Sequence, residues 1–279
     1  MRLRCSWLVV LATVAACDRP QPLIICHNTN CVGPDTTRDD SLPALGESLA
    51  LRYDGRPAID GIEWDTLWYG AESRCIFAHD LANDTSTPAT AAAQVIGDYL
   101  ASTPDAAWNA DRFHVFIELK GSVGAGFDDP HTPAQLIAHA ECALDALDLI
   151  YAGAQVQGHR LTVGFTTSVP ALLATLIASP RWPSYQNQPD LQLLLVGDIF
   201  LPYSSAVPEL SDYTVPLQAI EYHPDYMTEI KRETYRSLGM ELVQWQYLTT
   251  PESLDAIERW QPRYVLTNEA VLLRGWTER

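Results

Sequence analysis

Positive charge is scarce in this chain. The 279 residues include 18 Lys and Arg against 35 Asp and Glu, which gives a formal net charge of −17. Lysine is the rarest of the charged residues, because it occurs only as Lys120 and Lys231. A chain with this balance cannot bind nucleic acid or an anionic membrane by bulk electrostatics, so nucleic acid is excluded as a partner.

The apolar run near the start, Trp7–Ala16, is too short to span a membrane. Two arginines precede it and small residues end it just before Cys17, a pattern typical of a bacterial lipoprotein signal. We predict a signal peptide over residues 1–16, lipidation of Cys17 as the first mature residue, and a short tether over residues 17–22. The protein would then be anchored by its lipid in the bacterial cell envelope. An ordinary secretory signal would instead leave it secreted or periplasmic.

Cysteine is too widely spaced to indicate a zinc site, since no Cys-x-x-Cys pair occurs. The chain beyond the signal and its cleavage site has four cysteines, Cys26, Cys31, Cys75 and Cys142. An exported protein can oxidise them, and four cysteines allow three pairings. A bond between Cys26 and Cys31 would close the loop that holds His27, but buried free thiols remain an open alternative.

Internal repeats and low-complexity linkers are also lacking, so residues 23–279 are expected to form one domain. Apolar strand-like runs are predicted at Leu23–His27, Ala58–Asp65, Phe113–Leu119, Leu161–Phe165, Leu191–Val196, Val215–Tyr222, Glu241–Tyr247 and Tyr264–Leu266. Helical patterns separate most of them, at Ser41–Tyr53, Thr87–Ser102, Thr132–Gln155, Pro170–Ala178, Met227–Leu238 and Pro251–Trp260. Continuous apolar strands indicate a parallel sheet covered on both faces. Eight such units predict an α/β protein with a single (β/α)8 TIM-type barrel. A further short run, Cys75–Ala78, is expected to pair with the residues around Trp68.

Polar residues stand at or just past the ends of the first strand-like runs. They are His27, Asn28, Glu63, Asp65, His79, Glu118 and Lys120. The carboxyl ends of barrel strands converge on one mouth, and residues two apart on a strand point the same way. We therefore expect one site, although each residue taken alone has a simpler explanation as a structural histidine, a solvated strand end or a salt bridge.

The residue types at these positions suit phosphodiester cleavage beside a metal. Carboxylate and amide oxygens are hard ligands that favour calcium or magnesium. Two histidines can act as general base and general acid, and a lysine can stabilise negative charge on a phosphoryl group. The predicted cofactor is one divalent cation, calcium or magnesium.

The set resembles the phospholipase C-like phosphodiesterase superfamily, which includes glycerophosphodiester phosphodiesterases, phosphatidylinositol-specific phospholipases C and venom-type phospholipases D. The back half adds Val243-Gln244-Trp245 and Tyr264-Val265-Leu266-Thr267-Asn268, which resemble its late tryptophan strand and final threonine turn. Glycerophosphodiesterases usually have His-Arg at the first element. Asn28 departs from that pattern and is similar instead to the metal-binding Asn of calcium-dependent phospholipases C.

The resemblance implies a role for each residue. Catalysis would fall to His27, His79 and Lys120. The metal would be bound by Asn28, Glu63, Asp65 and Glu118. Substrate contacts are predicted for Trp245, Glu221, His223 and Asn268.

The expected function is an exported, metal-dependent phosphodiesterase that cleaves a glycerophosphodiester or a phospholipid head-group phosphodiester. One alternative is a phospholipase D-type enzyme similar to sphingomyelinase D. Another is a catalytically silent barrel that acts as a surface binding protein. A glycoside hydrolase using Glu118 and Glu221 would leave both histidines idle, and its two carboxylates would stand on strands expected to lie across the barrel from each other.

Overall fold

The computed structural model describes residues 21–70, 72–79, 86–104, 108, 110–123, 131–199 and 209–279. The predicted signal peptide, Cys17 and all but the last two residues of the predicted tether lie outside this described part. None of the helices within it is both long enough and apolar enough to cross a membrane.

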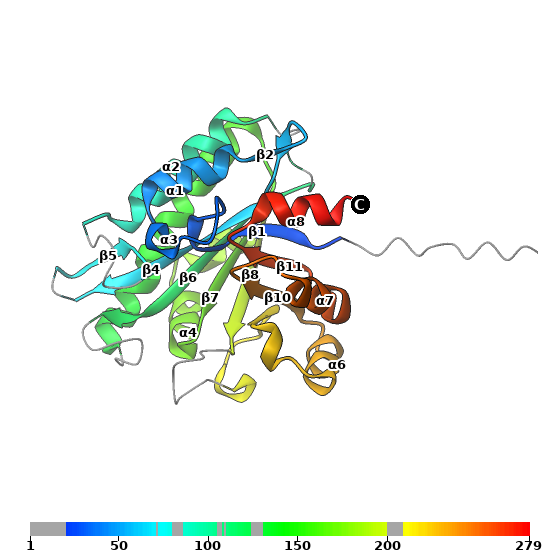
Figure 1. Ribbon diagram of the computed structural model, residues 1–279. Helices are drawn as coiled ribbons and strands as arrows, with labels where there is room; N and C mark the ends of the chain where they lie inside the picture. Colours follow the sequence, from blue (N-terminus) through cyan, green and yellow to red (C-terminus); the bar gives the residue numbers. More distant parts are fainter. Residues whose placement is uncertain are drawn as a thin grey trace, which may run out of the picture.

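Eight parallel strands close into a barrel surrounded by helices (Figure 1). The barrel strands are β1 (Leu23–Cys26), β4 (Gly61–Tyr69), β6 (Phe113–Val123), β7 (Leu161–Thr167), β8 (Leu191–Asp198), β9 (Ala219–Tyr222), β10 (Glu241–Gln246) and β11 (Tyr264–Thr267). Each pairs with the next, and β1 pairs with both β11 and β4, which closes the ring. The predicted TIM-type barrel is therefore confirmed.

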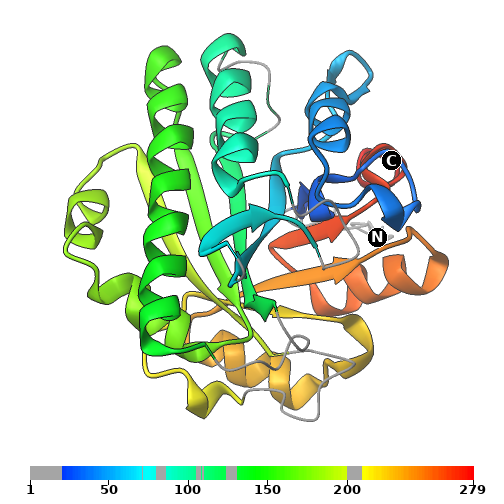
Figure 2. The same ribbon diagram turned by 90° about the vertical axis from the view of Figure 1, so that its left-hand side faces the viewer.

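Helices cover the outside of the barrel, and Figure 2 shows two of them, α2 and α3, side by side. The helices are α1 (Leu42–Ala50), α2 (Ala89–Ser102), α3 (Pro133–Gln157), α4 (Pro170–Ala178), α5 (Trp182–Gln186), α6 (Glu229–Ser237), α7 (Pro251–Trp260) and α8 (Ala270–Thr277). Local sequence sets their ends. At α3, the Thr132 hydroxyl accepts the Gln135 N–H, and Gly158 ends the helix in the left-handed conformation at φ 75°.

Several predicted boundaries shift. The helix predicted over Ser41–Tyr53 ends at Ala50, because an Asp54-Gly55 turn, with both residues at positive φ, folds β2 (Arg52–Tyr53) onto β3 (Arg56–Pro57). The strand predicted over Val215–Tyr222 begins only at Ala219.

The short run at Cys75–Ala78 is confirmed as a strand. It is β5 (Arg74–Phe77), which pairs antiparallel with β4 and places Cys75 opposite Trp68. The structure also settles the cysteine pairing, as disulfides join Cys26 to Cys31 and Cys75 to Cys142.

The barrel interior is built in layers because alternate residues of each strand point inward. Its centre is an apolar cluster, referred to below as the apolar layer, of Ile25, Phe116, Leu194, Val196, Ala219, Val243, Tyr264 and Leu266. Gly164 of β7 makes room in it, since a Cβ there would lie 2.6 Å from a ring carbon of Phe116. Glu118 follows Phe116 by two residues on the same strand, so the polar site rests directly on this apolar layer.

Below the apolar layer lies His114, which is only 3% exposed and meets the Tyr264 ring edge-on at 5.3 Å. Neither of its ring nitrogens has a hydrogen-bond partner among the described residues. Burial, assisted by the charge of Arg263, lowers the pKa of His114 from 6.5 to about 3.

This burial predicts a pH-dependent loss of stability. Between pH 6.5 and about 3 the unfolded state binds a proton at His114 that the folded state does not, so stability falls as pH falls through this window. His114→Phe keeps an aromatic ring but has no nitrogen to protonate. It should stabilise the fold by about 1–3 kcal/mol at pH 7, because it removes two buried nitrogens that lack hydrogen-bond partners among the described residues. At pH 5 the advantage should grow by roughly 2 kcal/mol. Urea unfolding of both proteins at both pH values measures the difference in stability. An equal difference at pH 7 and pH 5 would rule out the role of His114.

Candidate metal centre and catalytic mouth

Three carboxylates meet at the carboxyl ends of β4 and β6. Asp65 and Glu118 are direct register partners, and Glu63 precedes Asp65 by two residues on the same face. One oxygen from each of the three lies within 4.8 Å of the others. Glu63 and Asp65 are 1% and 0% exposed. The predicted convergence of these three residues is confirmed.

Lys120 is the cation that the structure places against this cluster. Its Nζ lies 3.1 Å from Asp65 Oδ2 and 3.2 Å from Glu118 Oε2. Burial favours the neutral form of Asp65, yet the charges of Lys120 and His79 lower its pKa below the ordinary value. Burial and the neighbouring Asp65 charge instead raise the pKa of Glu63 well above it. One lysine therefore does not neutralise three buried carboxylates, and a further cation or proton is required.

Oxygen atoms without partners indicate which cation fits. Glu63 Oε1, Asp65 Oδ1 and Asn28 Oδ1 are buried and have no hydrogen-bond partner within the described parts of the chain. A buried polar atom left unsatisfied costs about 1–3 kcal/mol, so these oxygens call for a ligand. All three are hard oxygen donors, so the set fits calcium or magnesium.

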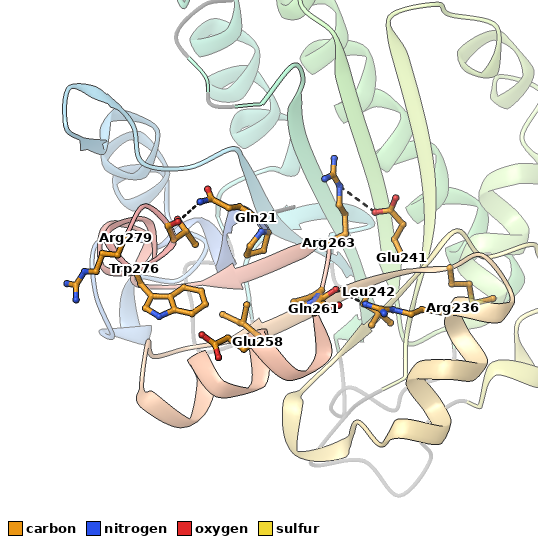
Figure 3. A pocket seen from close by; sticks show the side chains of 14 residues that line it. Gln21, Arg236, Glu241, Leu242, Glu258, Gln261, Arg263, Trp276 and Arg279 are labelled. Atoms are coloured by element: carbon orange, nitrogen blue, oxygen red, sulfur yellow. Dashed lines mark hydrogen bonds and ion pairs between the residues drawn. The ribbon is translucent and has the colours of Figure 1, made fainter. Parts of the chain in front are cut away.

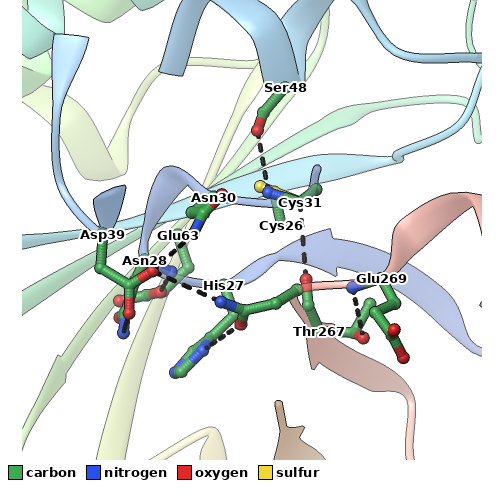
Figure 4. Close-up of a disulfide and its surroundings, with 11 residues drawn as sticks. Cys26, His27, Asn28, Asn30, Cys31, Asp39, Ser48, Glu63, Thr267 and Glu269 are labelled. Carbon is green, nitrogen blue, oxygen red and sulfur yellow. Dashed lines mark hydrogen bonds between the residues drawn. A yellow bond between two sulfur atoms is a disulfide. The ribbon is translucent and has the colours of Figure 1, made fainter. Parts of the chain in front are cut away.

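The loop after β1 brings Asn28 to this cluster (Figure 4). It forms a turn over His27–Thr29 in which Asn28 and Thr29 have φ of 47° and 57°. For a β-branched residue such as Thr29 this left-handed conformation costs of order 1–3 kcal/mol. This conformation directs the Asn28 backbone N–H toward Glu63, and it donates to Glu63 Oε2 at 2.5 Å.

Two acidic residues that the sequence did not single out hold this loop. Asp39 Oδ2 accepts from Asn28 Nδ2 at 3.3 Å, which leaves Asn28 Oδ1 available for a metal. The Asp40 N–H donates to Asn28 O at 2.8 Å, and Asp40 Oδ1 accepts from the Asp65 N–H at 3.1 Å. Both lie far from any strand end in sequence. Their one signal is the adjacent Asp39-Asp40 pair just before the Ser41 helix cap.

His27 is held in one orientation. Its Nδ1 lies 2.9 Å from Asn268 Oδ1, so Nδ1 carries the hydrogen and Nε2 is left as the acceptor. The ring stacks on Trp245 at 5.8 Å and meets Tyr247 edge-on at 5.2 Å. Burial lowers the pKa of His27 from 6.5 to about 4, although the Asn268 hydrogen bond works against this. His27 is thus neutral near pH 7, as a general base must be.

The second predicted histidine, His79, follows β5 and is partly buried. Its charge acts on the pKa of both Asp65 and His27, which places its ring near the same cluster. Its sequence neighbour Asp80 lies outside the described residues.

Asn268, for which a substrate contact was predicted, lies against His27. It is fully buried, its Oδ1 faces His27, and its Nδ2 donates to Asp39 Oδ1 at 3.4 Å. With both ends of its amide engaged by protein, it orients the imidazole.

The other predicted substrate residues lie around the mouth. Trp245 packs between His27 and His223, whose ring centroid is 4.7 Å from that of Trp245. Glu221 is 6% exposed and is the register partner of Asp198, the last residue of β8. The sequence reasoning missed Asp198, although it lies just two residues past the predicted apolar run. Burial, followed by the Asp198 charge, raises the pKa of Glu221 well above its ordinary value.

Two of the cavities in the described part of the chain flank the barrel strands. One, of about 630 Å³, borders the mouth and is lined by residues that include His223, Gln246 and Tyr247. The other, of about 770 Å³, lies at the amino ends of the strands, away from the carboxylates. Figure 3 shows it between Leu242, Arg263 and Trp276. Its lining includes no histidine and no carboxylate cluster among the described residues.

The barrel is similar to several solved enzyme structures. A phosphodiesterase from Oleispira antarctica, solved with the product sn-glycerol-3-phosphate, is 13% identical; the match covers 93% of this chain and 98% of that one at a TM-score of 0.58. A glycerophosphodiester phosphodiesterase from Parabacteroides distasonis is 12% identical, with 92% and 97% covered and a TM-score of 0.57. One from Thermotoga maritima is 13% identical, with 91% and 98% covered and a TM-score of 0.52.

The chain has the fold of the glycerophosphodiester phosphodiesterases. The resemblance that the motifs predicted is thereby confirmed at the level of the fold. No protein-family model and no curated protein matches the sequence. The site residues therefore rest on the geometry of this chain.

The His27–Asn268 contact can be tested without any substrate. Asn268→Asp places a carboxylate beside Nδ1 and should raise the pKa of His27 by about 1–3, because an adjacent negative charge favours the imidazolium. Titration of the His27 ring resonances by NMR measures the change. Asn187→Asp, at an exposed position on the protein surface, is the matched control and should leave the His27 titration unchanged. An identical His27 titration in both variants would mean that Asn268 does not orient the ring.

Proposed function

We propose that the protein is an exported, metal-dependent phosphodiesterase that cleaves a glycerophosphodiester or a phospholipid head-group phosphodiester. The observation that carries this proposal is the meeting of three carboxylates beside a neutral and oriented His27. Two of them, Glu63 and Asp65, have a buried oxygen without a hydrogen-bond partner among the described residues. A fold shared with glycerophosphodiester phosphodiesterases supports the same chemistry.

Glu63, Asp65, Glu118 and Asn28 are the residues that would hold the cation. When bound, a divalent cation would neutralise charge on the phosphoryl oxygens and increase the acidity of the attacking hydroxyl. The protein itself would hold these four residues in a buried position, so that a phosphate group binds a preorganised site.

His27 and His79 would divide the proton transfers. Nε2 of His27 is unprotonated and accepts the proton of the attacking hydroxyl, while His79 donates a proton to the leaving oxygen. Lys120, held by Asp65 and Glu118, offsets the negative charge that grows on phosphorus-bound oxygens. Attack by water yields a phosphomonoester and an alcohol. Attack by a neighbouring substrate hydroxyl yields a cyclic phosphate and an alcohol.

The alcohol part of the substrate would lie along the aromatic side of the mouth. Trp245 and Tyr247 surround His27 there, and the cavity of about 630 Å³ opens beside them. A cavity of this size accommodates a small polar head group.

Export is supported by the disulfides together with the sequence of the first residues. Disulfides persist in oxidising compartments, and two pairs are formed in the described part of the chain. We propose that residues 1–16 direct export and that Cys17 is lipidated. Labelling with a radioactive fatty acid, with Cys17→Ser as the control, tests this; equal labelling of the two proteins would disprove it.

Phosphorus NMR tests the reaction directly. Glycerophosphodiesters, phosphatidylinositol and lysophospholipids are each incubated with the protein and calcium or magnesium. A phosphomonoester or cyclic phosphate should form, and exhaustive chelation should stop it until metal is restored. Cyclic product from lysophospholipids would favour the phospholipase D-type alternative. A protein that leaves every substrate intact would be the silent binding barrel. Full activity after chelation would contradict the metal dependence.

Removal of either histidine should slow turnover without releasing the metal. His27→Ala and His79→Ala should each lower kcat by about two to four orders of magnitude, the scale of general acid–base catalysis. The loss of turnover in the double variant should be far smaller than the two single losses combined, because the two histidines act as a unit. Calorimetric metal titration of each variant provides the control. Unchanged turnover in both single variants would end the claim that these histidines are catalytic.

A further inference from the structure

A disulfide encloses the four residues that include His27 and Asn28 (Figure 4). Cys26 is the last residue of β1, and Cys31 lies five residues on, with a Cα–Cα distance of 5.3 Å. Both cysteines are buried, at 0% and 2% exposure. The bond therefore closes the loop next to the cluster and beneath the protein surface.

The two cysteines connect the loop to two different parts of the fold. Cys26 pairs in register with Thr267 of β11 and Ile62 of β4, so it is fixed in the barrel wall. The Cys31 N–H donates to Ser48 Oγ of α1 at 2.9 Å. The disulfide thus pins the far end of the loop to the strand on which the loop began.

The loop needs such a restraint because its conformation is locally unfavourable. Asn28 and Thr29 are consecutive non-glycine residues at positive φ. Relaxation of either would swing the Asn28 N–H away from Glu63 Oε2 and turn His27, the preceding residue, off Asn268. A backbone shift here would disturb the predicted base and one predicted metal ligand together.

We infer that the Cys26–Cys31 disulfide is a positioning element of the site, which holds His27 and Asn28 against Glu63 and Asn268. The protein would be competent only with this pair oxidised. The turnover readout rests on the proposed function, whereas the metal-affinity and hydrogen-exchange readouts do not need catalysis.

The second disulfide provides a matched control. It joins Cys75 of β5 to Cys142 of α3 across 67 residues, and neither cysteine lies in the loop. Two full-length variants separate the bonds. Cys75→Ala/Cys142→Ala keeps only the loop disulfide, and Cys26→Ala/Cys31→Ala keeps only the other. Outside these two pairs the variants have the same cysteines, so any effect of a reductant on them cancels.

Each variant is compared before and after treatment with dithiothreitol, whose two thiols are oxidised to a cyclic disulfide as each protein disulfide becomes two thiols. Reduction of Cys75→Ala/Cys142→Ala should weaken calcium or magnesium binding by about 10–100-fold, the usual effect of losing a group that orients a ligand. Turnover should fall with it and KM should change little. Cys26→Ala/Cys31→Ala should bind the metal weakly both before and after treatment with dithiothreitol. Circular dichroism confirms that each sample is folded.

Unchanged metal affinity on reduction of the first variant would overturn the inference. If Cys26→Ala/Cys31→Ala does not fold, the reductant arm of the first variant decides alone. If the oxidised protein binds no metal and cleaves no substrate, the proposed function has failed. Hydrogen exchange at the Asn28 amide then decides the positioning role, because reduction should speed it at least tenfold and equal rates would refute it.

Discussion

Burial of like charges at one end of the barrel is the constraint on which the rest of the structure depends. Glu63, Asp65 and Glu118 are brought within 4.8 Å of one another, and Lys120 supplies one compensating charge. Uncompensated charge in a protein interior is expensive, so this arrangement is stable only with a bound cation or with added protons. The strained loop at Asn28 fits the same requirement, since its backbone N–H donates to Glu63 and its amide oxygen has no hydrogen-bond partner in the described part of the chain.

The opposite end of the barrel shows what a purely structural charge looks like. Asp60 Oδ2 accepts from Arg274 Nη2 at 2.6 Å and from the Ile24 N–H at 2.9 Å, and Arg274 Nε donates to Ala58 O. That carboxylate has a guanidinium of its own and helps to fix β1 at the base. The carboxylates at the mouth lack such balance. The two ends of one barrel thus separate a group that stabilises the fold from groups that we propose bind a cation.

Local sequence predicted the parts of the site that depend on strand periodicity. Glu63, Asp65, Glu118 and Lys120 lie at the ends of apolar runs, and the two-residue period of a strand is enough to turn each of them inward. The barrel followed from the same runs. The boundaries moved where a turn, such as Asp54-Gly55, overrode the helical pattern.

Contacts between distant segments could not be predicted in this way. Asn268 meets His27 across 241 residues, and Asp198 reaches Glu221 only because β8 pairs with β9. Asp39 and Asp40 stand outside any periodic element, so the roles that they play in holding Asn28 arise from the path of one loop. The cysteine pairing also required the fold, since four cysteines alone leave three possibilities.

The central claim is that the carboxylate cluster is completed by a divalent cation. The most direct measurement is the thermal unfolding midpoint of the protein, stripped with chelator and then titrated with free calcium or magnesium. A cation that binds the folded state alone stabilises it in proportion to the logarithm of its concentration once sites are filled. We predict a midpoint that climbs steadily with metal in the wild-type protein and stays flat in Asp65→Asn. A wild-type midpoint that is the same in chelator and in millimolar metal would contradict the account.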